Sequence, residues 1–184
     1  MKSKFRDEFE ALSKEVGAFS FYYKTLRYLY LEATDEDYKC YDTIAPMFFD
    51  RHHNLLLERL YMGFRHFTDR PEMRGRENLS FRYFAEHPEL EGDKSHLLSQ
   101  VQDFEDTVEP IKKTLHRKLG HLDSEMRRGL EKPTWLERES FEDTCSKVFT
   151  ITNSIALLGW SFSIEFIDPN QNCDLFKLKR QLKK

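Results

Sequence analysis

The stretch LLSQVQDFEDTVEPIKKTLHRKLGHLD, residues 97–123, decides how this chain folds. Its apolar residues recur every three or four positions, which places their side chains on one face of an α-helix. Pro110 interrupts the pattern, so either the helix kinks there or a new helix begins just before the basic residues. The apolar stripe consists of Leu97, Val101, Phe104, Val108, Ile111, Leu115, Leu119 and Leu122.

Two further stripes of the same period lie toward the two ends of the chain. They predict one long helix over about residues 5–30 and another over about residues 137–165. The first consists of Phe5, Phe9, Leu12, Val16, Phe19, Tyr23, Leu26 and Tyr30, and the second of Phe141, Cys145, Val148, Ile151, Ile155, Leu158, Phe162 and Phe166.

Shorter signals complete the predicted fold. Pro46 suits the first turn of another helix, and Asn78 or Ser80 is a suitable N-cap for a short helix that ends near Glu86. No sustained segment alternates with a period of two. The sequence therefore predicts an all-α fold, a single helical domain over residues 1–184, with four or five main helices in a bundle plus short helices.

Composition narrows the function classes. The formal net charge of −3 excludes a globally basic nucleic-acid-binding surface but not a local one, such as the basic tail at residues 175–184. The three widely spaced cysteines indicate reduced thiols, and the N-terminus lacks the apolar run of a signal peptide, so we expect a cytoplasmic protein. The apolar run at residues 148–167 includes Asn153 and Glu165, which favours a buried helix over a membrane span.

A basic motif closes the opening stretch. On a helix, Lys113, Arg117 and His121 follow one another four positions apart and line one face. An imidazole moves protons near neutral pH and a guanidinium stabilises charge on phosphate, which is a minimal set for RNA cleavage without a metal. The alternative interpretation is an exposed basic stripe on a bundle helix. No Glu-x-x-His pair is present, so a di-metal carboxylate site is not predicted.

The residues around this motif resemble a known family. Gly120-His121-Leu122-Asp123 after a basic run resembles the "Arg-Asn-Lys…Ala-His-x-Asp" signature of the HEPN superfamily of all-helical ribonucleases. Phe67-Thr68-Asp69 and Gly75-Arg76-Glu77-Asn78-Leu79-Ser80 resemble the "Asp…Gly-x-x-Asn-Leu-Ser" linker of its abortive-infection, AbiU-like branch. The resemblance is strongest over residues 40–165.

The resemblance implies a metal-independent endoribonuclease of bacterial antiviral defence or of toxin–antitoxin type, with no cofactor. Its site is a composite one across a homodimer, and its expected partners are RNA, a second copy and an antitoxin or regulatory protein. By this analogy His121 activates a ribose 2′-OH and Arg117, helped by Lys113 or His116, stabilises the phosphorane. Asp123 orients an imidazole, or is a surface carboxylate.

The sequence departs from the family at one point. Three residues separate Arg117 from His121, which is a shorter spacer than the family has. This departure favours an alternative function, a catalytically inactive HEPN-like module for RNA binding or dimerisation. Arg82 to His87 and Arg59 to His66 satisfy the family's spacing, but both lie outside the Gly-His-x-Asp context, so we interpret them as chance matches.

Overall fold

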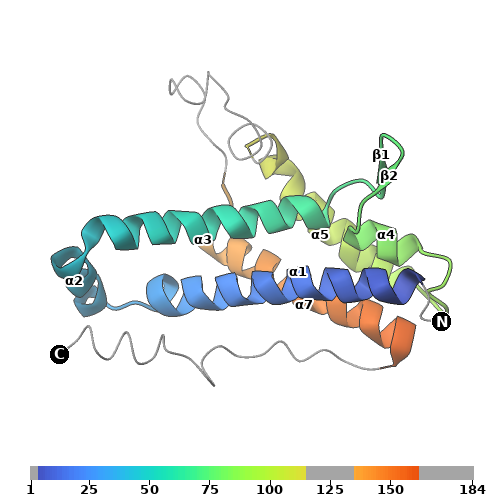
Figure 1. The fold of residues 1–184 in the computed structure, drawn as a ribbon, viewed down its shortest axis with the longest axis horizontal. Helices are drawn as coiled ribbons and strands as arrows, with labels where there is room; N and C mark the ends of the chain where they lie inside the picture. The colour runs from blue at the N-terminus through green and yellow to red at the C-terminus, as the bar shows by residue number, and fades with distance from the viewer. Residues whose placement is uncertain (1–3, 115–134, 162–184) are drawn as a thin grey trace. The chain divides into compact units, whose positions relative to one another are not determined.

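The computed structural model describes residues 4–114 and 135–161, and these residues form an all-α fold (Figure 1). Four long helices dominate the described part, which confirms the predicted fold class. The elements in chain order are α1 (Lys4–Leu26), the π-helical turn η1 (Arg27–Leu31), α2 (Asp35–Ile44), α3 (Pro46–Phe67), β1 (Glu72–Met73), β2 (Arg76–Glu77), α4 (Phe81–Glu86), α5 (Ser95–Thr114) and α7 (Arg138–Trp160). None of the described helices is long and apolar enough to span a membrane.

The chain divides into two compact units, which we describe separately. Among the described residues, unit 1 contains 4–16, 61–114 and 135–161, and unit 2 contains 17–60. Helices α1 and α3 each contribute one end to unit 1 and the other end to unit 2. The single-domain interpretation stays a prediction.

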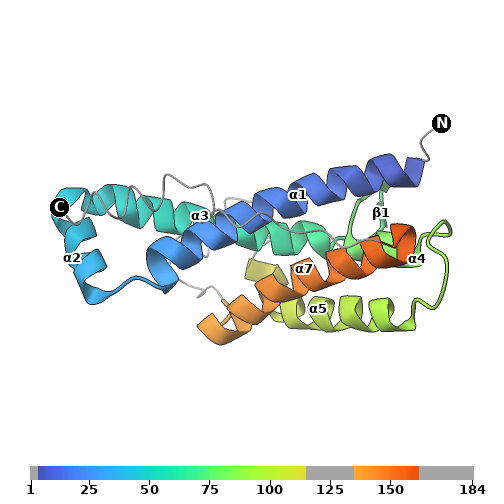
Figure 2. The same ribbon diagram turned by 90° about the horizontal axis from the view of Figure 1, so that it is seen from below.

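The core of unit 1 forms where α5 packs against α7 and α4 (Figure 2). The ring of Phe104 is fully buried on α5 and meets the rings of Phe64 and Phe81 edge-on. Every described member of the α5 stripe is buried, as the spacing predicts. On α7 the buried members of the predicted stripe are Phe141, Cys145, Val148, Ile151 and Ile155, whereas Leu158 is only half-buried.

Helix α4 is short, and its cap and apolar residues hold it in unit 1. The Ser80 hydroxyl accepts a hydrogen bond from the backbone N–H of Tyr83, so Ser80 is the N-cap that the sequence predicts. Phe84 of α4 is fully buried and lies against Phe5 and Phe9 of α1. These contacts anchor the short helix, because six residues alone do not form a stable helix in water.

In unit 2, the end of α1 departs from the prediction of one regular helix to Tyr30. The chain instead makes the π-helical turn η1, in which the Glu32 N–H donates to the Arg27 carbonyl five residues back. The wider turn exposes carbonyls that α2 uses, because the Tyr41 hydroxyl donates to the Leu29 carbonyl and the Tyr38 hydroxyl to that of Tyr30.

Helix α2 starts with a capping box. The Thr34 hydroxyl accepts from the Asp37 N–H, and the Asp37 carboxylate accepts from the Thr34 N–H. Thr34 is therefore the N-cap of α2, and the acidic residues that follow it form the first turn.

Of the two alternatives predicted at Pro110, the start of a new helix is wrong, since Pro110 lies inside α5 four residues before Thr114. The segment between α3 and α4 contains the antiparallel hairpin β1–β2, in which Met73 pairs with Arg76.

Candidate functional site

The basic motif begins at the end of α5. Lys113 belongs to the last turn of this helix, next to Thr114. The other predicted site residues, His116, Arg117, His121 and Asp123, lie outside the described residues. Their placement on one helical face with Lys113 therefore stays a prediction.

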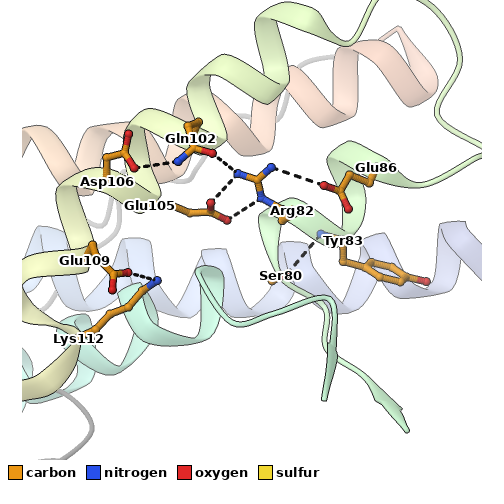
Figure 3. A network of polar contacts seen from close by, with 9 residues as sticks. All are labelled: Ser80, Arg82, Tyr83, Glu86, Gln102, Glu105, Asp106, Glu109 and Lys112. Atoms are coloured by element: carbon orange, nitrogen blue, oxygen red, sulfur yellow. Dashed lines mark hydrogen bonds and ion pairs between the residues drawn. The ribbon is translucent and has the colours of Figure 1, made fainter. Parts of the chain in front are cut away.

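Helix α5, which leads into the motif, is fixed to α4 by a partly buried ion pair (Figure 3). The Arg82 guanidinium donates to both carboxylate oxygens of Glu105, with Nε–Oε1 3.0 Å and Nη2–Oε2 2.6 Å. Nη2 also donates to the Gln102 side-chain oxygen at 2.7 Å, and Nη1 lies 3.5 Å from the Glu86 carboxylate. A bidentate pair of this kind fixes the orientation of the guanidinium and the carboxylate as well as the distance between them.

This pair has an electrostatic consequence for Arg82. The hydrogen bonds from Arg82 to Glu105 raise the pKa of the guanidinium, and Glu86 adds to the effect. Two carboxylates therefore compensate the charge of Arg82, which leaves this residue poorly suited to bind a phosphate.

His87, which together with Arg82 satisfies the family's Arg–His spacing, also has structural contacts. Its ring stacks on Phe5 with 4.3 Å between the centroids, and its Nδ1 accepts a hydrogen bond from the Glu89 N–H. In the second match, His66 belongs to unit 1 and Arg59 to unit 2.

A second set of contacts fixes α5 to α7. The Lys147 ammonium lies 2.8 Å from Asp103 and 3.1 Å from Asp143, and it donates to the Thr107 hydroxyl at 3.1 Å. Nearer the start of α5, the Ser154 hydroxyl donates to the Gln100 side chain at 2.8 Å. Polar contacts from α4 and α7 therefore hold α5 over several turns before the motif begins.

Unit 2 contains a cluster of aromatic and imidazole rings that sequence reasoning did not identify. The Tyr30 hydroxyl donates to the Phe49 carbonyl at 3.0 Å and lies 2.8 Å from Nδ1 of His52. The His53 ring lies 4.8 Å from the Tyr30 ring, measured between centroids. Burial lowers the pKa of both imidazoles, which favours their neutral form.

Imidazoles such as those of His52 and His53 are also common metal ligands. Among the residues that the structure describes, no group of three or more His, Cys, Asp or Glu side chains is arranged to hold a metal ion. The positions of Tyr30 and Phe49 on separate helices explain why spacing along the chain did not reveal the cluster.

We compared the chain with family models, with curated proteins and with solved structures, and found no match in any of the three.

Proposed function

We propose that this chain is a HEPN-like protein of the metal-independent endoribonuclease lineage, of bacterial defence or toxin type, which acts on RNA through residues 113–123. Two features support the proposal: the residue pattern around His121 and an all-α fold, which is the fold class that the resemblance implies.

The observation that carries the proposal concerns Arg82 and His87, the other Arg–His pair with the family's spacing. Both residues have partners within the fold. Arg82 is held by Glu105 and Glu86, and His87 stacks on Phe5. A residue that already has a partner in the fold is a poor candidate for binding substrate. The pair Arg117 and His121 therefore becomes the better candidate, and it follows a helix that α4 and α7 hold in place.

In the proposed reaction, His121 takes the proton from a ribose 2′-OH, whose oxygen then attacks the adjacent phosphorus. The bond to the 5′-oxygen breaks, this oxygen takes up a proton from water, and the products are a 2′,3′-cyclic phosphate and a free 5′-hydroxyl. Arg117 stabilises the charge on the phosphorane, with Lys113 and His116 as additional positive groups. Asp123 orients an imidazole. A second copy supplies the other half of a composite site.

The experiment compares RNA cleavage by the wild-type chain with cleavage by His121→Ala and Arg117→Ala. A general base contributes about 10²–10⁴-fold to a rate, so His121→Ala is expected to abolish measurable cleavage. Arg117→Ala is expected to lose most of the activity, and EDTA is expected to have no effect. The matched controls are His66→Ala, which removes an exposed imidazole, and His87→Ala.

The same experiment tests the alternative function, a catalytically inactive module for RNA binding or dimerisation. The short spacer between Arg117 and His121 is the observation that favours it. A wild-type chain that binds RNA without cleaving it, and loses affinity on Arg117→Ala, supports the module. If neither substitution changes any nucleic-acid property, both functions are excluded for this motif.

A further inference from the structure

The hairpin β1–β2 in unit 1 presents arginines at an unusual tip. Its strands are two residues long and are joined by Arg74 and Gly75, both with positive φ angles, 55° and 73°. Two positive φ angles in a two-residue connection are the mark of a type I′ turn, where Asn or Gly is favoured at the first position. In Figure 1 the hairpin stands away from the neighbouring helix α4.

The base of the hairpin is firmly attached. The Asn78 N–H donates to the Pro71 carbonyl and the Asn78 side chain to the Arg70 carbonyl, each at 2.7 Å. At the end of β2, Glu77 accepts a hydrogen bond from Lys4 of α1, and Lys4 also pairs with Glu8. The Asn78 bonds close the base of the hairpin, and the Lys4 contact joins it to α1.

The charges of the hairpin are distributed unevenly. Glu77 at the base is compensated by Lys4, and the hydrogen bonds between them raise the pKa of the Lys4 ammonium. The exposed side chains of Arg70, Arg74 and Arg76, by contrast, form no hydrogen bond or ion pair with residues 4–114 or 135–161. Glu72 on β1 is also an exposed carboxylate, so the positive charge is concentrated at the tip, where Arg74 and Arg76 lie, on a chain whose formal net charge is −3.

The backbone at Arg74 supplies a second, independent observation. A left-handed conformation is unfavourable for a side chain with a Cβ, and arginine lacks the short polar group that lets Asn adopt it more readily. Strained residues that a fold retains tend to occur where ligands are bound. Arginine at this position weakens the turn and places a guanidinium at an exposed position.

We propose that the hairpin is a phosphate-backbone contact for RNA, a role that rests on the proposed function of the chain. All three cations are arginines, whose planar guanidinium matches the geometry of two phosphate oxygens better than an ammonium does. Met73, which is 56% exposed, pairs across the hairpin with Arg76 and offers an apolar contact to a base or ribose. The hairpin thus holds RNA while residues 113–123 act on it.

The test uses variants in which a loss of binding cannot be attributed to unfolding. Arg74→Asn removes the cation but relieves the strained turn, so the melting temperature is expected to rise while affinity for RNA falls. Arg74→Lys keeps the charge and is the matched control. The probe is a fluorescently labelled single-stranded RNA, and binding to the full chain is followed by anisotropy over a range of salt concentrations.

Salt dependence identifies the contact as one to phosphate. For each arginine that neutralises a phosphate of single-stranded RNA, the slope of log affinity against log salt changes by about 0.7. The wild-type slope is therefore expected to become shallower by that amount in Arg74→Asn, and by more in the double variant Arg70→Gln, Arg76→Gln. Arg74→Lys is expected to retain the wild-type slope.

The possible outcomes separate this inference from the proposed function. If Arg117→Ala weakens RNA binding and the hairpin variants do not, the hairpin inference is wrong and the proposed function stands. If only the hairpin variants weaken binding, the inference holds and the proposed site fails. A wild-type chain without affinity for RNA overturns both. Binding to vesicles of anionic lipid in place of RNA, lost in the hairpin variants, also overturns the inference.

Discussion

Phe104 and Phe149 both lie on long helices of unit 1, but they differ in environment. Phe104 is fully buried between rings from α3 and α4, whereas Phe149 on α7 is only half-buried. The reason is the phase of the α7 stripe, since Val148 occupies the inward position and Phe149 is turned about 100° from it. A high aromatic content does not by itself identify the inward residues.

We expect Phe104→Ala to lower the free energy of unfolding by about 3–5 kcal/mol, because the substitution leaves a cavity in the core. Phe149→Ala is expected to cost clearly less, since part of its ring already contacts water. Chemical denaturation of both variants measures the difference. Equal losses would show that the two rings are equally buried in solution.

The imidazoles of unit 2 predict a pH dependence of stability. Burial lowers the pKa of His52 and His53 from 6.5, although for His53 the nearby Asp50 acts in the opposite direction. Between the folded-state pKa values and 6.5, the unfolded chain binds more protons than the folded one. The contribution of these imidazoles to the free energy of unfolding is therefore greatest above pH 6.5. It decreases as the pH falls from 6.5 through the lowered folded-state pKa values.

Denaturation above and below this pH measures the effect. The decrease is expected to be smaller in the double variant His52→Gln, His53→Gln, which has no imidazole to protonate at these positions. His66→Gln is the control, because His66 is exposed. A double variant with the full wild-type decrease would place the responsible groups elsewhere.

At the scale of elements, the attachment of α2 to η1 rests on two tyrosines in different surroundings. Tyr41 is buried, and burial raises the pKa of its hydroxyl to about 12, whereas Tyr38 is 44% exposed. Tyr41→Phe leaves the Leu29 carbonyl without its partner in a buried place, so we expect a loss of about 1–3 kcal/mol.

Tyr38→Phe is the matched control for this prediction. Water can replace the lost hydroxyl there, and the Tyr30 carbonyl also accepts from the Ala33 N–H, so we expect a loss below about 1 kcal/mol. Free energies of unfolding from urea titration compare the two. A larger effect of Tyr38→Phe would contradict the proposed difference in solvent access.

Most helices could be predicted from the sequence because their evidence is local. The stripes of α1 and α5, the proline at the start of α3 and the Ser80 cap each lie within one segment. The π-helical turn and the hairpin could not be predicted in the same way. The carbonyls of η1 bond to tyrosines of another helix, and the hairpin depends on Lys4, far away in the sequence. At the candidate site only Lys113 lies within the described residues, so the site remains a hypothesis from residue pattern.

At the scale of the whole molecule, we expect a symmetric homodimer in solution. The resemblance implies one, and unit 2 exposes large apolar side chains that include Met47, Phe48 and Leu55. Light scattering at micromolar concentration is expected to give twice the monomer mass of 22.1 kDa.

Substitution of single exposed residues tests which surface is involved. Phe48→Ser is expected to shift the mass toward the monomer, whereas Leu157→Ser, which removes another exposed apolar side chain, one that belongs to unit 1, is expected to have no effect. A monomeric wild-type chain would remove the composite-site mechanism as well.

The hydroxyl-to-carbonyl bonds of α2 also bear on how this fold can change during evolution. A main-chain acceptor is present whatever residue occupies positions 29 and 30, so only the tyrosine side of each bond can be lost by substitution. Such bonds leave no correlated pairs of substitutions among descendants of this chain. The junction between α1 and α2 would therefore be under-represented in any map of contacts inferred from co-varying positions, although a buried tyrosine holds it together.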